Sequence, residues 1–276
     1  MPSENPILNI FIDTRKPITE ICSRKLVISQ ENERLRDVLN LMLAKGFRKI
    51  PIVDKPRHLK GIVTSIDILD LLGGGEKYKI FKKNKKSMDL RVEKFMTRHV
   101  RTINFKTNIK KSIEIFKREG FGLCPVADSK KILGVISDQD FVKQVNKTLG
   151  IKVYEVMVER PIIAKKGYSV YDTAKMMCRG GFRRLPVVED DILLGIMTPT
   201  DILLYLHKNG IEDNLVLDRT RIEKVMNREP VTIREDTDLL SAINVMKREN
   251  VGGLPVVEDD ELAGIITERD ILEVLI

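Results

Sequence analysis

The sequence predicts an α+β fold made of four β-α-β-β-α repeats, and two observations carry this prediction. A motif of Gly, two apolar residues, Ser or Thr, any two residues and Asp occurs four times: GIVTSID (61–67), GVISDQD (134–140), GIMTPTD (195–201) and GIITERD (264–270). A Pro stands nine or ten residues before the Gly of each copy, at Pro51, Pro125, Pro186 and Pro255. Such self-similarity is typical of a repeat architecture.

Each repeat is expected to begin with a short extended segment. Met96, Met157 and Met226 stand 29 residues before their Pro, and Cys22 takes this place in the first repeat. A helix follows, as in residues 32–46, whose apolar residues recur at helical spacing at Leu35, Val38, Leu39 and Met42.

A glycine near the end of this helix predicts a left-handed stop, at Gly46, Gly120 and Gly180 in the first three repeats. Two strands are expected next, KIPIV (49–53) and KGIVT (60–64) in the first repeat, followed by a second helix, IDILDLL (66–72). This order gives the β-α-β-β-α unit.

A repeat of roughly 60 residues has a marginal core, so we expect the repeats to pair. The gap from each motif Asp to the next Met is 29 residues (67 to 96), then 17 (140 to 157), then 25 (201 to 226), which favours pairing one with two and three with four. The predicted divisions are an N-terminal segment 1-17, repeat one 18-72, a basic linker 73-90, repeat two 91-148, repeat three 149-208 and repeat four 209-276.

Composition narrows the class of protein. No apolar run approaches the roughly 18 residues of a membrane span, and the first residues lack the features of a secretory signal, so we expect a cytoplasmic protein with no membrane partner. The three Cys have no paired spacing, which predicts neither a disulfide framework nor a metal site. The net charge of +8 favours anionic partners, and six Lys fall within residues 77–86.

The quoted motifs, together with the preceding GFRKIPIVD (46–54) and its counterparts, resemble CBS domains, and two consecutive copies resemble a Bateman module. Four copies in one chain are similar to the nucleotide-binding gamma subunit of AMP-activated protein kinase. The resemblance implies two Bateman modules packed as a flat disc. It also implies a non-enzymatic energy sensor that binds AMP, ADP or ATP between paired repeats and acts on a regulated partner protein.

The resemblance further implies which residues hold the ligand. The Asp that ends each motif would bind the ribose hydroxyls, at Asp67, Asp140, Asp201 and Asp270. The hydroxyl three residues earlier would lie near the ribose and phosphate, at Thr64, Ser137, Thr198 and Thr267. The adenine would lie against the first strand of the partner repeat, near Ser23, Ile28, Thr97, Thr102, Val158, Ile163, Asn227 and Thr232.

In this family the residues two and three before each Pro face the cleft of the partner repeat. They are Arg48 with Lys49, Gly122 with Leu123, Arg183 with Arg184, and Gly252 with Gly253. Crossing between partners assigns the first pair to Asp140 and the third pair to Asp270. These two sites are therefore the better candidates for phosphate binding, because Arg and Lys bind phosphate oxygens. Gamma subunits often have His before this Pro, and its absence here leaves the response to AMP against ATP open.

Other interpretations stay open. Ser/Thr-x-x-Asp is close to a helix capping box, which would give the motif a purely structural role. S-adenosylmethionine or a related adenosyl ligand would use the same Asp. A nucleic-acid-binding function through the basic surface is a third hypothesis, and it predicts steep salt dependence. Whether the chain forms a homodimer also stays open.

Overall fold

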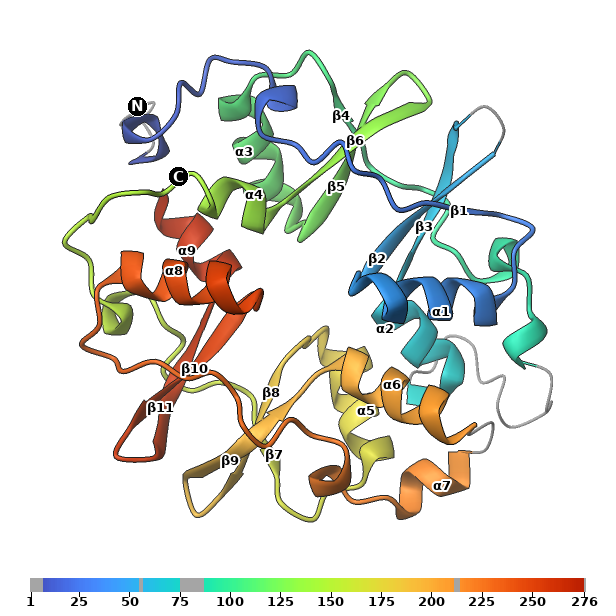
Figure 1. Ribbon diagram of the computed structural model, residues 1–276, viewed down its shortest axis with the longest axis vertical. Helices are drawn as coiled ribbons and strands as arrows, with labels where there is room; N and C mark the ends of the chain where they lie inside the picture. Colours follow the sequence, from blue (N-terminus) through green and yellow to red (C-terminus); the bar gives the residue numbers. More distant parts are fainter. Residues whose placement is uncertain (1–6, 55–56, 75–86, 211–213, 276) are drawn as a thin grey trace. The chain divides into compact units, whose positions relative to one another are not determined.

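The computed structural model describes residues 7–54, 57–74, 87–210 and 214–275 (Figure 1). The chain divides into two compact units. Unit 1 consists of Met1–Leu26, Arg101–Pro161 and Val231–Ile276, and unit 2 consists of Val27–Val100 and Ile162–Pro230. Most of repeats two and four therefore lies in unit 1, and most of repeats one and three in unit 2. The Lys-rich run of residues 77–86 lies outside the described residues.

Unit 2 contains the main elements of repeats one and three. Those of repeat one are β1 (Ser29–Gln30), α1 (Leu35–Lys45), β2 (Lys49–Val53), β3 (Leu59–Thr64), α2 (Ser65–Leu69) and a π-helical turn (Asp70–Gly74). Those of repeat three are β7 (Ala164–Lys165), α5 (Val170–Gly180), β8 (Leu185–Glu189), β9 (Ile192–Met197) and α6 (Pro199–Asn209), followed by α7 (Asn214–Arg219).

Unit 1 contains the main elements of repeats two and four. Those of repeat two are β4 (Ile103–Asn104), α3 (Ile109–Glu119), β5 (Leu123–Asp128), β6 (Lys131–Ser137) and α4 (Asp138–Val142). Those of repeat four are α8 (Leu239–Glu249), β10 (Gly253–Glu258), β11 (Glu261–Thr267) and α9 (Glu268–Leu275). The predicted α+β class and the β-α-β-β-α order are confirmed.

Each repeat builds its sheet in the same way. In repeats one to three the short first strand pairs in parallel with the second strand, which pairs antiparallel with the third. In repeat four the first strand is reduced to a parallel bridge between Ile233 and Val256. The third strand of each repeat leads directly into the second helix, so every motif Asp lies in the first turn of a helix.

The predicted apolar face of α1 is confirmed, since Leu35, Val38, Leu39 and Met42 are all buried. The helix ends at Gly46, whose φ of 68° is left-handed. The expectation for repeat three was wrong by one residue, because Gly180 is the last helical residue of α5 and Gly181 adopts the left-handed φ of 69°. Both positions are glycine, so composition alone could not distinguish them.

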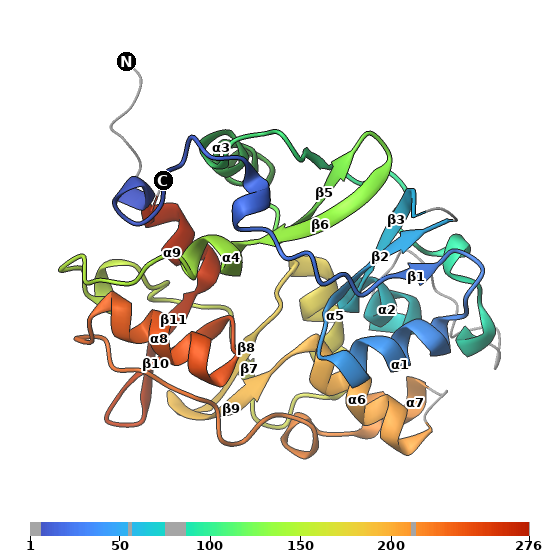
Figure 2. The same ribbon diagram turned by 45° about the horizontal axis from the view of Figure 1, so that its top comes forward.

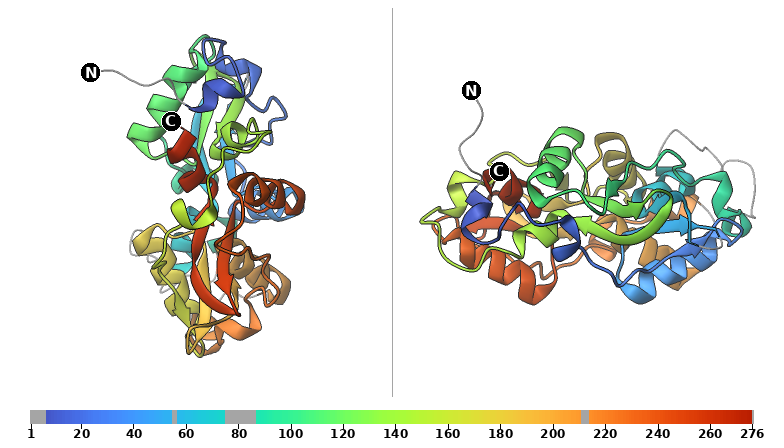
Figure 3. Two further views of the ribbon diagram at one scale, coloured as in Figure 1. Left: turned by 90° about the vertical axis from the view of Figure 1, so that its left-hand side faces the viewer. Right: turned by 90° about the horizontal axis from the view of Figure 1, so that it is seen from above.

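Helices from alternate repeats pack together within each unit. In unit 2, α2 packs against α5 and α6, and α5 also packs against α7, so that the helices of repeats one and three form one cluster (Figure 2). In unit 1, α4 of repeat two packs against α9 of repeat four (Figure 3). Each unit encloses its own buried apolar core.

Consecutive repeats are joined in a different way, by exchange of their leading segments. Four antiparallel bridges carry this exchange: Ser23 with Val135, Thr97 with Ile62, Val158 with Ile265, and Asn227 with Ile196. The first segment of each repeat therefore crosses the third strand of its neighbour. This exchange joins repeat one with two and repeat three with four, as the gap lengths predicted, whereas the apolar cores are shared by alternate repeats.

Candidate ligand-binding sites

The four motif Asp side chains are fixed by the Ser or Thr that precedes each of them by three residues. In every repeat the Asp Oδ2 accepts a hydrogen bond from the backbone N–H of that residue at 2.7–2.8 Å. The same Oδ2 accepts a second hydrogen bond from the hydroxyl at 2.6–2.7 Å. The capping interpretation of the motif is therefore correct as local structure.

These bonds hold one carboxylate oxygen and leave the other available. Within the described part of the chain, Oδ1 of Asp67, Asp140 and Asp201 accepts no hydrogen bond. A carboxylate oxygen has two lone pairs, so Oδ1 can accept from both hydroxyls of a cis-diol. Hydrogen bonds to an ionised acceptor are the stronger kind. Capping therefore orients the carboxylate through Oδ2 and leaves Oδ1 able to accept hydrogen bonds from a ligand.

A further Ser-x-x-Asp sequence, which caps a helix outside the repeated motif, shows what capping alone requires. At the start of α5, the Ser169 hydroxyl donates to Asp172 Oδ2 at 2.8 Å, and the Asp172 N–H donates to Ser169 Oγ at 3.0 Å. The side chain of Asp172 is 58% exposed. The four motif Asp residues are instead partly buried. Their burial is therefore not a consequence of capping.

Burial also changes the acidity of two of these carboxylates. It raises the pKa of Asp140 above the usual 3.8, against the opposing effect of the hydrogen bonds from Ser137. Burial likewise raises the pKa of Asp201, opposed by the hydrogen bonds from Thr198 and then by the positive charge of Arg48. The ionised form of each carboxylate is thus poorly solvated. Hydrogen bonds from the hydroxyl groups of a ligand would stabilise it.

Two cysteine thiols lie near these carboxylates. Burial raises the pKa of Cys22 in unit 1, and the negative charge of Asp140 adds to the increase. Burial raises the pKa of Cys178 in unit 2 to about 12, with further contributions from Asp70 and Asp67. Both thiols are therefore protonated at neutral pH and act as small apolar side chains.

The motif Gly is explained by the crossing of the partner segment. A Cβ added at Gly195 would lie 2.4 Å from the carbonyl oxygen of Asn227 and 3.0 Å from Met226 Sδ. The same approach recurs at the three other motif glycines, where the nearest atoms belong to Met96 and Thr97, Cys22 and Ser23, and Val158 and Met157. Glycine lets the two backbones meet, and the sulfur side chain covers the crossing.

The proposed adenine-wall residues divide into two groups. Ser23, Thr97, Val158 and Asn227 form the crossing bridges, so their backbone groups are used by the partner strand and only their side chains remain for a ligand. The others lie a few residues further along, at Ile28, Thr102, Ile163 and Thr232. Each of these falls in the unit that does not contain the Asp to which it was assigned. Their assignment stays a prediction.

The basic residues also have neighbours that the sequence did not indicate. In the β2–β3 hairpin, Lys49 lies directly opposite Thr64 of its own repeat. Side chains opposite each other in an antiparallel pair share a face, so Lys49 lies beside the Asp67 motif. The charge of Arg48 acts on Asp201 within unit 2. Cations therefore accompany the two Asp residues that the sequence ranked lower.

The assignment of Arg48 and Lys49 to Asp140, and of Arg183 and Arg184 to Asp270, joins residues of different units. It stays a prediction. Within unit 1, Lys143 is the cation whose charge acts on Asp140. Lys143 lies one turn after Asp140, and no part of the repeat pattern indicated it.

An open surface cavity of about 430 Å³ lies beside the crossing of repeat three over repeat four. It is lined by Tyr154, Met157, Glu159, Arg160, Glu235 and Ala263. Met157, Glu159 and Arg160 flank the predicted adenine-wall residue Val158, and Ala263 lies on β11, the strand that leads to Asp270. The sequence prediction missed Tyr154, Arg160 and the two acidic residues.

One position in the repeats differs in repeat three and could have indicated this cavity from the sequence. Two residues after the Met or Cys, repeats one, two and four have Arg24, Arg98 and Arg228. Each of these guanidinium groups donates to the carbonyl oxygen five residues earlier. Repeat three has Glu159 at this position. The leading segment of repeat three therefore lacks an Arg that bonds the carbonyl oxygen five residues earlier. The cavity lies beside this segment.

Among residues 7–54, 57–74, 87–210 and 214–275, no group of three or more His, Cys, Asp or Glu is arranged to hold a metal ion. In the same described part of the chain, no helix combines the length and apolar character needed to cross a membrane.

Four repeats joined in pairs by exchanged segments, each with an oriented carboxylate at a helix start, define a paired-repeat module. The chain belongs to the CBS-domain family, which matches residues 18–74, 92–147, 153–208 and 222–276. CBS domains are typically regulatory rather than catalytic, so this is a CBS-domain regulatory protein.

Relatives extend over nearly the whole chain. Uncharacterized protein MJ1225 of Methanocaldococcus jannaschii is 30% identical over 267 residues, which cover 91% of this chain and 95% of that protein. A 33.4 kDa protein of the ribosomal RNA operon of Thermofilum pendens is 27% identical over 268 residues, with 90% and 87% covered.

Two solved structures show the same fold. The crystal structure of MJ1225, described as a candidate archaeal homologue of gamma-AMPK, has a TM-score of 0.85 and 28% identity, and covers 93% of this chain and 99% of that one. A conserved protein of Pyrococcus horikoshii has a TM-score of 0.61 at 18% identity, covers 94% of this chain and 100% of that one, and supports the fold alone.

Proposed function

We propose that this protein is a non-enzymatic sensor of adenine nucleotides. AMP, ADP or ATP would bind beside the four motif carboxylates, with the ribose hydroxyls donating to the Asp. Occupancy would shift the protein between conformations that a partner protein distinguishes. A ligand can do this only if it binds the two conformations with different affinities.

The observation that supports this proposal most is the shared geometry of the four carboxylates. Each is partly buried and held through Oδ2 at the start of a helix. In Asp67, Asp140 and Asp201 of the described chain the other oxygen accepts no hydrogen bond. An oriented, poorly solvated carboxylate is suited to a neutral pair of hydroxyl donors such as a ribose.

The surrounding charges support a phosphorylated ligand. Lys49 lies on the same face as the Asp67 motif, and the charge of Arg48 reaches Asp201. Both cations could therefore contact phosphate groups of a nucleotide whose ribose is bound by the neighbouring Asp. The similarity to MJ1225, described as a candidate homologue of gamma-AMPK, favours adenine as the base.

Isothermal titration of the full chain with AMP, ADP and ATP tests the proposal. We expect saturable heat from at least one of them, with displacement by the other two. The absence of heat at millimolar concentrations of all three would contradict the proposal. Displacement of bound ATP by S-adenosylmethionine at lower concentration would favour an adenosyl ligand instead. Binding of RNA or DNA that weakens steeply with salt would favour the nucleic-acid hypothesis.

The raised pKa of Asp140 predicts how binding depends on pH. The ribose hydroxyls need the ionised carboxylate, so affinity at this site is present above the raised pKa and is lost as the pH falls through it. We therefore expect the loss to occur at a higher pH than the usual aspartate value of 3.8. Binding near this pH should also release a proton, because the ligand favours the ionised form.

Calorimetric titrations of AMP between pH 4 and pH 7, in buffers of different ionisation enthalpy, measure both effects. The phosphate of AMP titrates near pH 6, so the Asp140→Asn variant serves as the baseline for the ligand. Identical pH profiles for the two proteins would show that Asp140 does not titrate with binding.

A further inference from the structure

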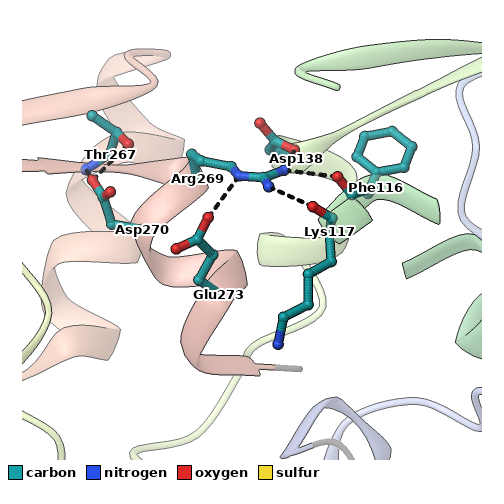
Figure 4. A network of polar contacts seen from close by, with 7 residues as sticks. All are labelled: Phe116, Lys117, Asp138, Thr267, Arg269, Asp270 and Glu273. Carbon is teal, nitrogen blue, oxygen red and sulfur yellow. Dashed lines mark hydrogen bonds and ion pairs between the residues drawn. The ribbon is translucent and has the colours of Figure 1, made fainter. Parts of the chain in front are cut away.

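The side chain of Arg269 joins repeat four to repeat two inside unit 1 (Figure 4). Its Nη1 donates to the carbonyl oxygen of Phe116 at 3.1 Å, and its Nη2 donates to that of Lys117 at 3.4 Å. Nη1 also lies 3.9 Å from Oδ1 of Asp138, and Nε donates to Glu273 at 3.0 Å. The first turn of α9 is thereby tied to the end of α3 and to the first turn of α4.

Both partners of this ion pair belong to the ligand motifs. Asp138 lies between Ser137 and Asp140, and Arg269 immediately precedes Asp270. Each therefore shares a helical first turn with a candidate ribose-binding carboxylate. Since α4 packs against α9, the two turns are neighbours in the core of the unit. A movement of the first turn of one helix therefore moves the first turn of the other, because Arg269 and Asp138 connect them.

A second contact strengthens this connection. The ring of Phe116, whose carbonyl oxygen accepts from Arg269, packs edge to face on the ring of Phe141 at 5.1 Å between centroids. Phe141 directly follows Asp140. The side chain of Asp138 is 10% exposed and that of Arg269 is 27% exposed. Because the Asp138 carboxylate is largely excluded from water, loss of the nearby guanidinium charge would be unfavourable, and the ion pair therefore links the two helix starts.

The corresponding positions of unit 2 lack this ion pair. Where repeats two and four have Asp138 and Arg269, repeats one and three have Ser65 and Thr200. In repeat two the residue matching Arg269 is Gln139, which accepts a hydrogen bond from Lys143 at 2.7 Å within its own helix. The link between motifs through Arg269 is thus a property of unit 1, although α2 and α6 also pack together in unit 2.

We propose that Arg269 couples the Asp140 and Asp270 sites, so that a nucleotide at one site raises the affinity of the other. This inference rests on the proposed nucleotide-binding function. A ligand that shifts the first turn of one helix moves the contacts of Arg269 and Asp138 with it, and these contacts shift the first turn of the other helix. The second ligand then meets a motif that is already in the shifted position, and it binds more tightly.

The test uses AMP and the full chain carrying Asp67→Asn and Asp201→Asn, which leaves the two sites of unit 1. Adding Asp140→Asn or Asp270→Asn gives the dissociation constant of each single site by calorimetry. With both sites intact, we expect the second AMP to bind about fivefold more tightly than its single-site constant predicts. In the Arg269→Met variant this ratio is expected to fall to one.

The outcomes separate the coupling from the function on which it rests. If AMP binds both sites and the ratio is one with Arg269 present, or survives Arg269→Met, the coupling is overturned while nucleotide binding stands. If AMP binds neither site of unit 1 but binds the original chain through Asp67 or Asp201, only the coupling is overturned. If AMP does not bind the original chain either, both proposals are overturned. The matched control is Arg118→Met at the end of α3, where the guanidinium bonds the adjacent Glu119, and it should retain the ratio.

If circular dichroism shows that Arg269→Met does not fold, Asp138→Asn takes its place. This change removes the ion pair and keeps the hydrogen bonds from Arg269 to α3. We expect it to lower the ratio. An unchanged ratio in Asp138→Asn would overturn the link between Arg269 and α4.

Discussion

Replacing Asp140 and Asp270 together by Asn is expected to weaken AMP binding at their two sites by about 100-fold or more. Two hydroxyls bonded to a charged acceptor contribute about 3 kcal/mol or more in total, which corresponds to that factor. In Asn the amide oxygen can take over the capping bonds from Ser137 or Thr267, but the amide nitrogen would then meet the ribose as a second donor. Calorimetric titration with AMP measures the loss.

The Asn variants separate binding from folding. Because the cap is kept, we expect the free energy of unfolding to change by less than about 1 kcal/mol. Asp172→Asn is the control, since Asp172 also accepts a hydrogen bond from the hydroxyl of a helix-capping serine, Ser169, outside the ligand motif. Its AMP affinity should equal that of the original chain. Unchanged affinity in the Asp140 and Asp270 variant would mean that the motif is a cap and no more.

Gly195→Ala is expected to lower the free energy of unfolding by about 3 kcal/mol, at the upper end of the usual cost of overpacking. The new methyl group would lie 2.4 Å from the carbonyl oxygen of Asn227, and a backbone atom cannot rotate away. The bridge between Ile196 and Asn227, with its two hydrogen bonds of 2.9 Å, would have to open. Urea denaturation measures the loss.

Gly46→Ala is the control for the effect of adding a methyl group to a glycine. Nothing lies within 4 Å of a Cβ at Gly46, so only the strain of its left-handed φ remains, about 1 kcal/mol. Equal losses in the two variants would show that the crossing tolerates a side chain. In that case the fourfold recurrence of this Gly would need another explanation.

The two kinds of repeat contact explain why the candidate sites are unequal. The exchanged segments bring predicted adenine-wall residues to each Asp motif, and they connect repeats that are neighbours along the chain. Helix packing instead joins alternate repeats, and it brings Arg48 toward Asp201 and Arg269 toward Asp138. The repeat pattern predicts the exchange between neighbouring repeats, because the gap lengths along the chain limit which repeats can meet. It does not predict the helix contacts, because these join residues more than 100 positions apart.

Features that depend on residues a few positions apart could be predicted from the sequence. Apolar residues at helical spacing identified the buried face of α1, because a helix buries one side. The motif hydroxyl and Asp identified a helix start, since capping depends on residues three positions apart. The left-handed residue after α5 was misplaced, because Gly180 and Gly181 satisfy the same steric requirement. Tyr154 and Arg160 were missed, because the cavity is formed by residues of two repeats.

The sequence by itself determined the number of repeats, their order of elements, their pairing along the chain and the four capped Asp residues. Those features depend on spacings of a few residues and on linker lengths, which a single chain displays directly. Only the tertiary structure decided why each motif begins with Gly, which cations accompany which Asp, and that Arg269 ties two motifs together. These depend on the packing of distant segments, where one close backbone approach or one buried charge determines the arrangement.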